Sequence, residues 1–185
     1  MKYLLEGQQT DRIKFRLLQR SDFDTWLSFF EHPDAATYLG MQDIGSPKEQ
    51  CEAWFNKVEG RYKNNTGGLN VLVEKSSGRF VGQCGLLVQE VDGKDELEIG
   101  YSLLPEFWNK GYATEAARLC RDYAFEHNFR DSLISIIHVD NIRSEKVALK
   151  NDMRLTKQTT YRGLPVNIYR ITQEEWEKMT LPGSK

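Results

Sequence analysis

The stretch 98–116, EIGYSLLPEFWNKGYATEA, holds residue types that suit the binding of a phosphorylated ligand. An apolar strand leads to Pro105, a loop containing Gly111 follows, and a helix then begins. Free backbone N–H groups and the positive end of a helix dipole meet at such a helix N-terminus and attract anions. On the residues alone, a phosphate cradle and an ordinary glycine-eased connection fit this stretch equally well. The chain lacks GxxxxGK(S/T) and GxGxxG, which disfavours a P-loop NTPase and a dinucleotide fold.

Two further groups of residues have types that could take part in chemistry. Asn141 suits the N-cap of a short predicted helix, and Ser144 falls in the first turn of that helix. That capping role needs no ligand. Glu96 and Glu98 share one face of a predicted strand, where two like charges could raise each other's pKa. Glu98 is therefore a candidate general base. The alternative is that Glu96 and Glu98 both face solvent on an ordinary half-exposed strand.

Length, charge and cysteine usage limit the class of protein. The 185 residues suit one domain, 1–185, and the net charge of −2 gives no strong field toward nucleic acid or an anionic membrane. The chain has no apolar run of about 18 residues, and its start lacks an apolar signal core, so we expect a cytoplasmic protein with no membrane span. Three widely spaced cysteines without CxxC indicate reduced thiols, and with the three histidines they show no zinc-ligand spacing, so we expect no metal.

Hydrophobic periodicity and turn residues predict the elements that position these groups. Strands are predicted over 13–18, 69–75, 79–89, a segment ending near 103, 133–139, 154–160 and 165–172. Helices are predicted over 22–31 with Ser21 as N-cap, 47–62 after Ser46, a small-residue segment after Gly111, and 141–150. A last helical turn is expected over 173–179, with frayed residues at 181–185. This order predicts one α/β domain with a mostly antiparallel sheet.

The stretch 98–116 and the later HVDNIRSEKVALKNDMRL together closely resemble the GNAT superfamily of acetyl-CoA-dependent N-acetyltransferases. The RimJ/RimL-like branch is the most similar, and the resemblance covers roughly Arg12 to Trp176, so the core is expected at about 12–176. It implies a sheet of about seven strands that splits between the fourth and fifth, about four flanking helices, and acetyl-CoA as cosubstrate in the opening. The implied protein is a monomer or homodimer.

The resemblance also implies roles for individual residues. Gly111 would allow close approach of the CoA pyrophosphate, and Thr114 would add a hydroxyl donor. Asn141 would hydrogen-bond the pantetheine arm, and Ser144 would lie near the CoA sulfur. The positions that match the family's pyrophosphate loop are Trp108, Asn109, Lys110, Gly111, Tyr112 and Ala113. The positions whose backbone would pair with the pantetheine arm are Leu103 and Leu104.

Two departures from the family pattern change these expectations. Many members carry a tyrosine seven residues after the asparagine, as the acid for the departing thiolate, and this chain has Ala148 there. Ser144 thereby becomes the candidate acid. The glycine that usually closes this helix is replaced by Asp152, where either Asn151 or Asp152 tolerates a left-handed cap.

The resemblance places the acceptor between the first two helices and the last hairpin. Tyr38, Trp54 and Tyr161 are the candidate substrate-binding residues, with Arg162 and Tyr169 beside them. The resemblance to the RimJ/RimL-like branch makes the N-terminal α-amine of a protein or peptide the favoured acceptor. An α-amine deprotonates more easily than a lysine amine, so it needs little help from a base. Two alternatives stay open: a transferase for a small amine such as an antibiotic, polyamine or amino sugar, and a non-catalytic acyl-CoA-binding module.

Overall fold

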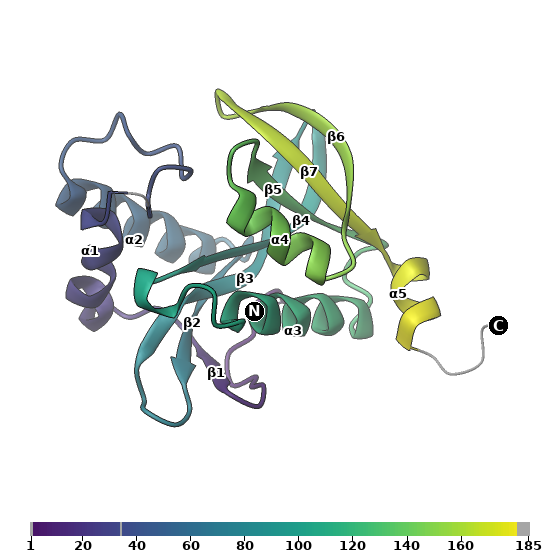
Figure 1. Cartoon of the computed structure of the whole chain (residues 1–185), viewed down its shortest axis with the longest axis horizontal. Helices are drawn as coiled ribbons and strands as arrows, with labels where there is room; N and C mark the ends of the chain where they lie inside the picture. Colours follow the sequence, from purple (N-terminus) through teal and green to yellow (C-terminus); the bar gives the residue numbers. More distant parts are fainter. Residues whose placement is uncertain (1, 34, 181–185) are drawn as a thin grey trace.

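The computed structural model describes residues 2–33 and 35–180, so the expected fraying at 181–185 lies outside the described residues. Within these described residues, seven strands form one sheet in the order β1-β2-β3-β4-β5-β7-β6 (Figure 1). The strands are β1 (Ile13–Arg16), β2 (Gly67–Glu74), β3 (Phe80–Val91), β4 (Lys94–Leu103), β5 (Ser132–His138), β6 (Arg154–Tyr161) and β7 (Leu164–Thr172). Neighbouring strands run antiparallel except β4 and β5, which are parallel. The predicted fold class is confirmed.

The sheet separates between β4 and β5, as predicted. These strands pair at a single position, Glu98 with Ile134. On its other edge, β4 pairs with β3 along its whole length, from Lys94 opposite Val91 to Leu103 opposite Gly82. The second half of β4 therefore has an edge that no strand covers, and we call the space beside it the opening.

Among the described residues, five α-helices flank the sheet, where about four were predicted. They are α1 (Phe23–Glu31), α2 (Pro47–Lys63), α3 (Tyr112–Glu126), α4 (Ile142–Lys150) and α5 (Gln173–Thr180). The Ser46 prediction is confirmed, because its hydroxyl accepts from the Glu49 N–H at the start of α2. The Ser21 prediction is wrong. Arg20–Asp22 form a 3-10 turn, and α1 begins after Asp22, whose carboxylate is held by Arg16.

The helices lie in two layers, one on each face of the sheet. On β3, Cys84 contacts Cys120 of α3, with 3.6 Å between the sulfur atoms, whereas the adjacent Gln83 accepts from Trp54 of α2 at 3.2 Å. Because neighbouring side chains of a strand point to opposite faces, these contacts define an α3 face and an α2 face. The small residues predicted for α3 let it lie close to the sheet, and Ala116 is fully buried.

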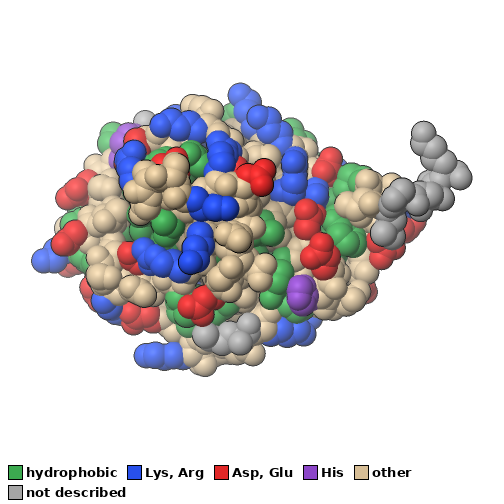
Figure 2. Space-filling model, turned by 90° about the horizontal axis from the view of Figure 1, so that it is seen from below, with side chains coloured by type: hydrophobic (Ala, Val, Ile, Leu, Met, Phe, Trp, Pro, Cys, Tyr) green, Lys and Arg blue, Asp and Glu red, His purple; other side chains and the backbone are tan. Residues whose placement is uncertain are grey.

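Left-handed backbone marks the predicted turns. Asp92-Gly93 and Arg162-Gly163 have positive φ at both positions, which fits the tight hairpins β3–β4 and β6–β7. Asp152 has φ of 62° after α4, so it takes the left-handed position expected there. No helix within the described part of the chain is both long and apolar enough to cross a membrane. Figure 2 shows acidic and basic side chains interspersed over the lower face.

Candidate active site

The N-terminus of α3 presents a row of unused backbone donors. Gly111 precedes the helix in the left-handed conformation, with φ of 84°. The N–H groups of residues 109–114 donate to no acceptor among the described residues. A pyrophosphate needs several donors at close range, so residues 108–113, which we call the phosphate loop, fit such a group. The structure thus favours the phosphate cradle over a plain connection.

The phosphate loop is held from behind by Arg12, which sequence reasoning missed. The Arg12 Nε donates to Glu115 Oε2 at 2.6 Å, and its Nη1 donates to the Lys110 carbonyl at 3.0 Å. The guanidinium also lies over the Tyr112 ring, 4.3 Å from its centroid. The Lys110 carbonyl is thus fixed, while the loop N–H groups keep no acceptor among the described residues. Near the loop, the sequence offered one sign of this contact, the carboxylate of Glu115 in the first turn of α3.

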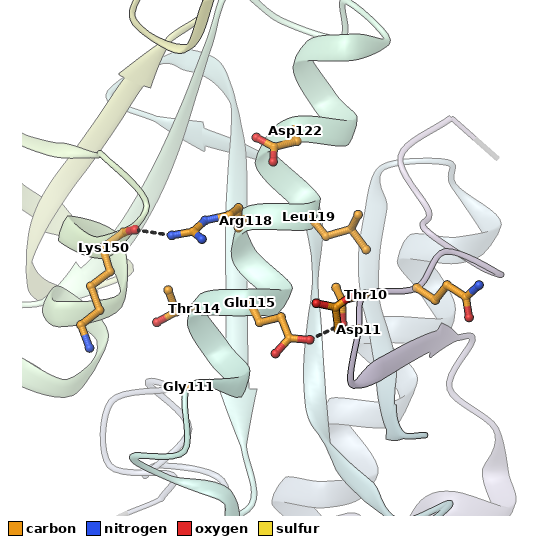
Figure 3. A pocket seen from close by; sticks show the side chains of 10 residues that line it. Thr10, Asp11, Gly111, Thr114, Glu115, Arg118, Leu119, Asp122 and Lys150 are labelled. Carbon is orange, nitrogen blue, oxygen red and sulfur yellow. Dashed lines mark hydrogen bonds between the residues drawn. The ribbon is translucent and has the colours of Figure 1, made fainter. Parts of the chain in front are cut away.

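A hollow of about 540 Å³ lies beside the start of α3 (Figure 3). Gly111, Thr114, Arg118 and Lys150 contribute to its lining, and Figure 3 shows Thr114 and Arg118 on the side of α3 that faces α4. Arg118 donates to the Lys150 carbonyl at 3.2 Å and so links the two helices. Thr114 and Lys150 thus line the same hollow as Gly111, where their side chains could contact phosphate oxygens.

The uncovered edge of β4 offers backbone groups to the opening. Both backbone groups of Leu104 form hydrogen bonds within the protein. Its N–H donates to the Val81 carbonyl, and its carbonyl accepts from the Phe107 N–H. Backbone groups alternate between the two edges of a strand, so those of Leu103 and Tyr101 point into the opening. The Leu103 carbonyl accepts from the Trp108 indole at 2.8 Å. The backbone groups that remain for a ligand in the opening are the Leu103 N–H and the N–H and carbonyl of Tyr101.

The start of α4 closes the opening from the α3 face. Asn141 is the N-cap, as predicted, and its Oδ1 accepts from the Ser144 N–H at 3.1 Å. The Tyr101 hydroxyl donates to the Ser144 carbonyl at 2.8 Å, a contact that sequence reasoning missed. Burial raises the pKa of Tyr101 well above its ordinary value, so its phenol stays protonated. The candidate acid Ser144 is thus held against the Tyr101 side chain, while Ala148 is buried in the core.

Glu98 lies on the α2 face, at the point where β4 and β5 separate. Its Oε2 accepts from Gln89 Nε2 at 2.7 Å, and Gln89 Oε1 accepts from the Tyr161 hydroxyl at 3.0 Å. Loss of water raises the pKa of the Glu98 carboxyl. The predicted cause was wrong, because Glu96 is held in an ion pair with Arg170 at 2.6 Å, and burial produces the rise.

The predicted acceptor residues divide into two groups. Tyr161 joins the hydrogen-bond chain to Glu98, and the Tyr38 ring lies 5.0 Å from the ring of His138, at the end of β5. Trp54 is only 6% exposed and packs in the core of the α2 face, so it is not open to an acceptor. Tyr169 is 1% exposed and donates to Glu145 of α4, so it belongs to the α3 face.

The sheet thus has an opening beside β4, and the loop before α3 carries unused N–H donors that fit a phosphorylated ligand. The family model of the acetyltransferase (GNAT) domain matches residues 12–154. The uncharacterized protein YkkB of Bacillus subtilis (strain 168) is 33% identical over 162 residues, which cover 86% of this chain and 92% of the relative. The chain therefore belongs to the GNAT acetyltransferases, and it is an acetyltransferase that uses acetyl-CoA.

Two solved structures share the fold. RimL, a ribosomal L7/L12 alpha-N-protein acetyltransferase in complex with coenzyme A, has a TM-score of 0.70 at 15% identity, covering 91% of this chain and 98% of RimL. Spermidine N-acetyltransferase from Vibrio cholerae, in complex with CoA and spermine, has a TM-score of 0.69 at 16% identity, covering 90% of this chain and 99% of that chain. Both likenesses show that this chain has the fold of these acetyltransferases.

Proposed function

We propose that this enzyme acetylates the N-terminal α-amine of a protein or peptide by direct transfer from acetyl-CoA. The observation that carries the proposal is Glu98, a carboxyl of raised pKa on the α2 face, at the point where the sheet separates. Its position beside the opening suits a base for an amine that enters from this face. RimL, which shares the fold, carries the name of an enzyme that acts on a protein α-amine.

The cosubstrate would be held by backbone donors. The N–H groups of the phosphate loop and Thr114 would bind the pyrophosphate, with the Lys110 ammonium offsetting part of its charge. Leu103 and Tyr101 would pair with the pantetheine arm as an added strand. Leu104 takes no part in that pairing because both its backbone groups are used within the protein. Asn141 would meet the arm at the start of α4.

Bound acetyl-CoA supplies the acetyl group as a thioester. Glu98 would accept a proton as the amine nitrogen bonds to the carbonyl carbon, and a backbone N–H of β4 would stabilise the charge on the carbonyl oxygen. The carbon–sulfur bond breaks, and the Ser144 hydroxyl would give its proton to the departing sulfur. Water would then return a proton to Ser144 and take the proton from Glu98. An α-amine has a pKa near 7.7–8.0, against about 10.4 for lysine, so a carboxylate base suffices.

Mass spectrometry of peptides incubated with acetyl-CoA tests this function. The peptides begin with Ala, Ser, Thr or Met and contain one internal lysine, and spermidine and an amino sugar complete the panel. We expect acetylation of the α-amine and none at the lysine. Acetylation of spermidine or the sugar alone would show that the acceptor is a small amine instead, as the name of the Vibrio cholerae neighbour suggests.

A further inference from the structure

Three basic side chains gather around Glu98 on the α2 face. Lys57 and Arg61 come from one stripe of α2, and Arg162 comes from the β6–β7 turn. Lys57, Arg61 and Glu98 affect one another's pKa, and Arg162 affects the pKa of Lys57, Arg61 and Tyr161, so the groups share one region. None of the three cations, which we call the basic cluster, has an ion-pair partner within 4.0 Å among residues 2–33 and 35–180.

The basic cluster is held in place by contacts with neutral groups. Arg61 donates to the carbonyls of Val88 at 2.6 Å and Thr66 at 2.9 Å, and its Nε is buried without a hydrogen-bond partner. The Arg162 guanidinium lies 5.1 Å from the centroid of the Tyr161 ring, within cation–π range. Arg61 is thus fixed to the backbone of β3 next to Gln89, and Arg162 lies beside Tyr161 of the Tyr161–Gln89–Glu98 chain.

The charges of this region do not balance. Three cations face one carboxyl, and burial favours the neutral form of that carboxyl, Glu98. Loss of water is also the main cause that lowers the pKa of Lys57, with Arg162 next. Lys57 and Arg61 stand four residues apart on α2, a spacing at which like charges repel. An anion bound here would offset both the repulsion and the lost hydration.

We propose that the acceptor carries a carboxylate close to its amine, and that Lys57 and Arg162 bind this carboxylate while the amine lies at Glu98. The inference rests on the proposed function and narrows its substrate to acidic N-termini. The same carboxylate chemistry occurs in a free acidic amino acid, so the experiment includes one. A polyamine brings only positive charge, and the basic cluster would repel it.

Steady-state kinetics on matched acceptors test the proposal. The acceptors are the peptides Ser-Glu-Glu-Ala, Ser-Gln-Gln-Ala and Ser-Lys-Lys-Ala, free glutamate, and spermidine. We expect kcat/KM to be about tenfold higher for the acidic than for the neutral peptide, a ratio that corresponds to about 1.4 kcal/mol. The ratio should fall toward one in Lys57→Gln and Arg162→Gln, and in 0.5 M salt because the cluster is partly exposed. Lys63→Gln, at the end of the same helix, should keep the ratio.

The outcomes separate the inference from the proposed function. Peptide turnover without an acidic preference overturns the inference and leaves the function standing. Turnover of free glutamate alone supports the inference and overturns the peptide acceptor, and preference for spermidine overturns both. Binding of Ser-Glu-Glu-Ala to the CoA complex is measured in parallel by calorimetry. If neither turnover nor binding of any carboxylate acceptor is seen, or binding survives Lys57→Gln with Arg162→Gln, the inference fails.

Discussion

Arg12 and Glu115 join the start of the described chain to the first turn of α3, with 2.6 Å between Arg12 Nε and Glu115 Oε2. The same guanidinium donates to the Lys110 carbonyl, so one side chain fixes both the helix and the loop that precedes it. Loss of water alone would raise the pKa of the partly exposed Glu115 carboxyl, but hydrogen bonds from Thr10 and Arg12 outweigh it and lower the pKa. The loop geometry thus depends on a contact remote in sequence.

Replacement of Arg12 by Gln should weaken the binding of acetyl-CoA more than that of a thioester without the pyrophosphate. We expect KM for acetyl-CoA to rise about tenfold, because a charge-assisted contact contributes about 1.5–3 kcal/mol and part of it remains. Activity with S-acetyl-pantetheine, which lacks the pyrophosphate, should change little. Arg154→Gln, which removes an exposed ion pair to Glu175, is the control. Equal losses with both thioesters would show that Arg12 supports the fold and not the phosphate loop.

Replacement of Gly111 by Val should abolish cosubstrate binding. A β-branched residue at a φ of 84° is strained, and its Cβ would lie 3.3 Å from Arg12 Nη2. Wild-type protein should gain thermal stability from acetyl-CoA, by about 2.7 kcal/mol at a concentration of 100 Kd. Gly93→Val imposes similar backbone strain in the β3–β4 turn, where nothing lies within 4 Å of the added Cβ, and should retain this gain. A gain retained by Gly111→Val would refute the loop assignment.

The Ser144 hydroxyl should matter for the rate and little for binding. We expect Ser144→Ala to lower kcat about 100-fold, the lower range for loss of a general acid, with Kd for acetyl-CoA within about twofold. Asn141→Ala provides the contrast, because it removes the helix cap and should cost about 1 kcal/mol of stability. Kinetics and calorimetry on both variants separate the two roles. Parallel loss of rate and affinity in Ser144→Ala would leave Ser144 a binding residue.

The features that could be predicted from the sequence are those set by neighbouring residues. Asn141 caps α4, and Ser46 caps α2, because cap and helix lie within a few residues. Contacts between remote segments could not be predicted in this way. Glu98 was assigned to the correct face of its strand, since side chains alternate. Its partner Gln89 and the ion pair of Glu96 with Arg170 depend on strand order and register, which no local pattern contains.

The ionisation of Glu98 should oppose folding and support catalysis. Burial raises the pKa of this carboxyl, so folding favours its protonated form. Protonated Glu98 contributes its full share of stability below its pKa in the unfolded chain, about 4.3. This contribution is lost as the pH rises through its pKa in the folded protein. Glu98→Gln should therefore raise the melting temperature at pH 7.5 by about 2–4 °C, equivalent to about 1 kcal/mol, and the gain should shrink toward pH 4.

The same variant should lose the base, with kcat/KM for the amine acceptor about 100-fold lower. Glu96→Gln is the matched control on the same face of β4, and it should lower stability at pH 7.5 because it breaks the ion pair with Arg170. Thermal unfolding and initial rates measured from pH 4 to pH 9 test both effects. A melting temperature of Glu98→Gln below that of wild type at pH 7.5 would show that Glu98 acts as a structural partner of the nearby cations, and full activity would rule out its role as base.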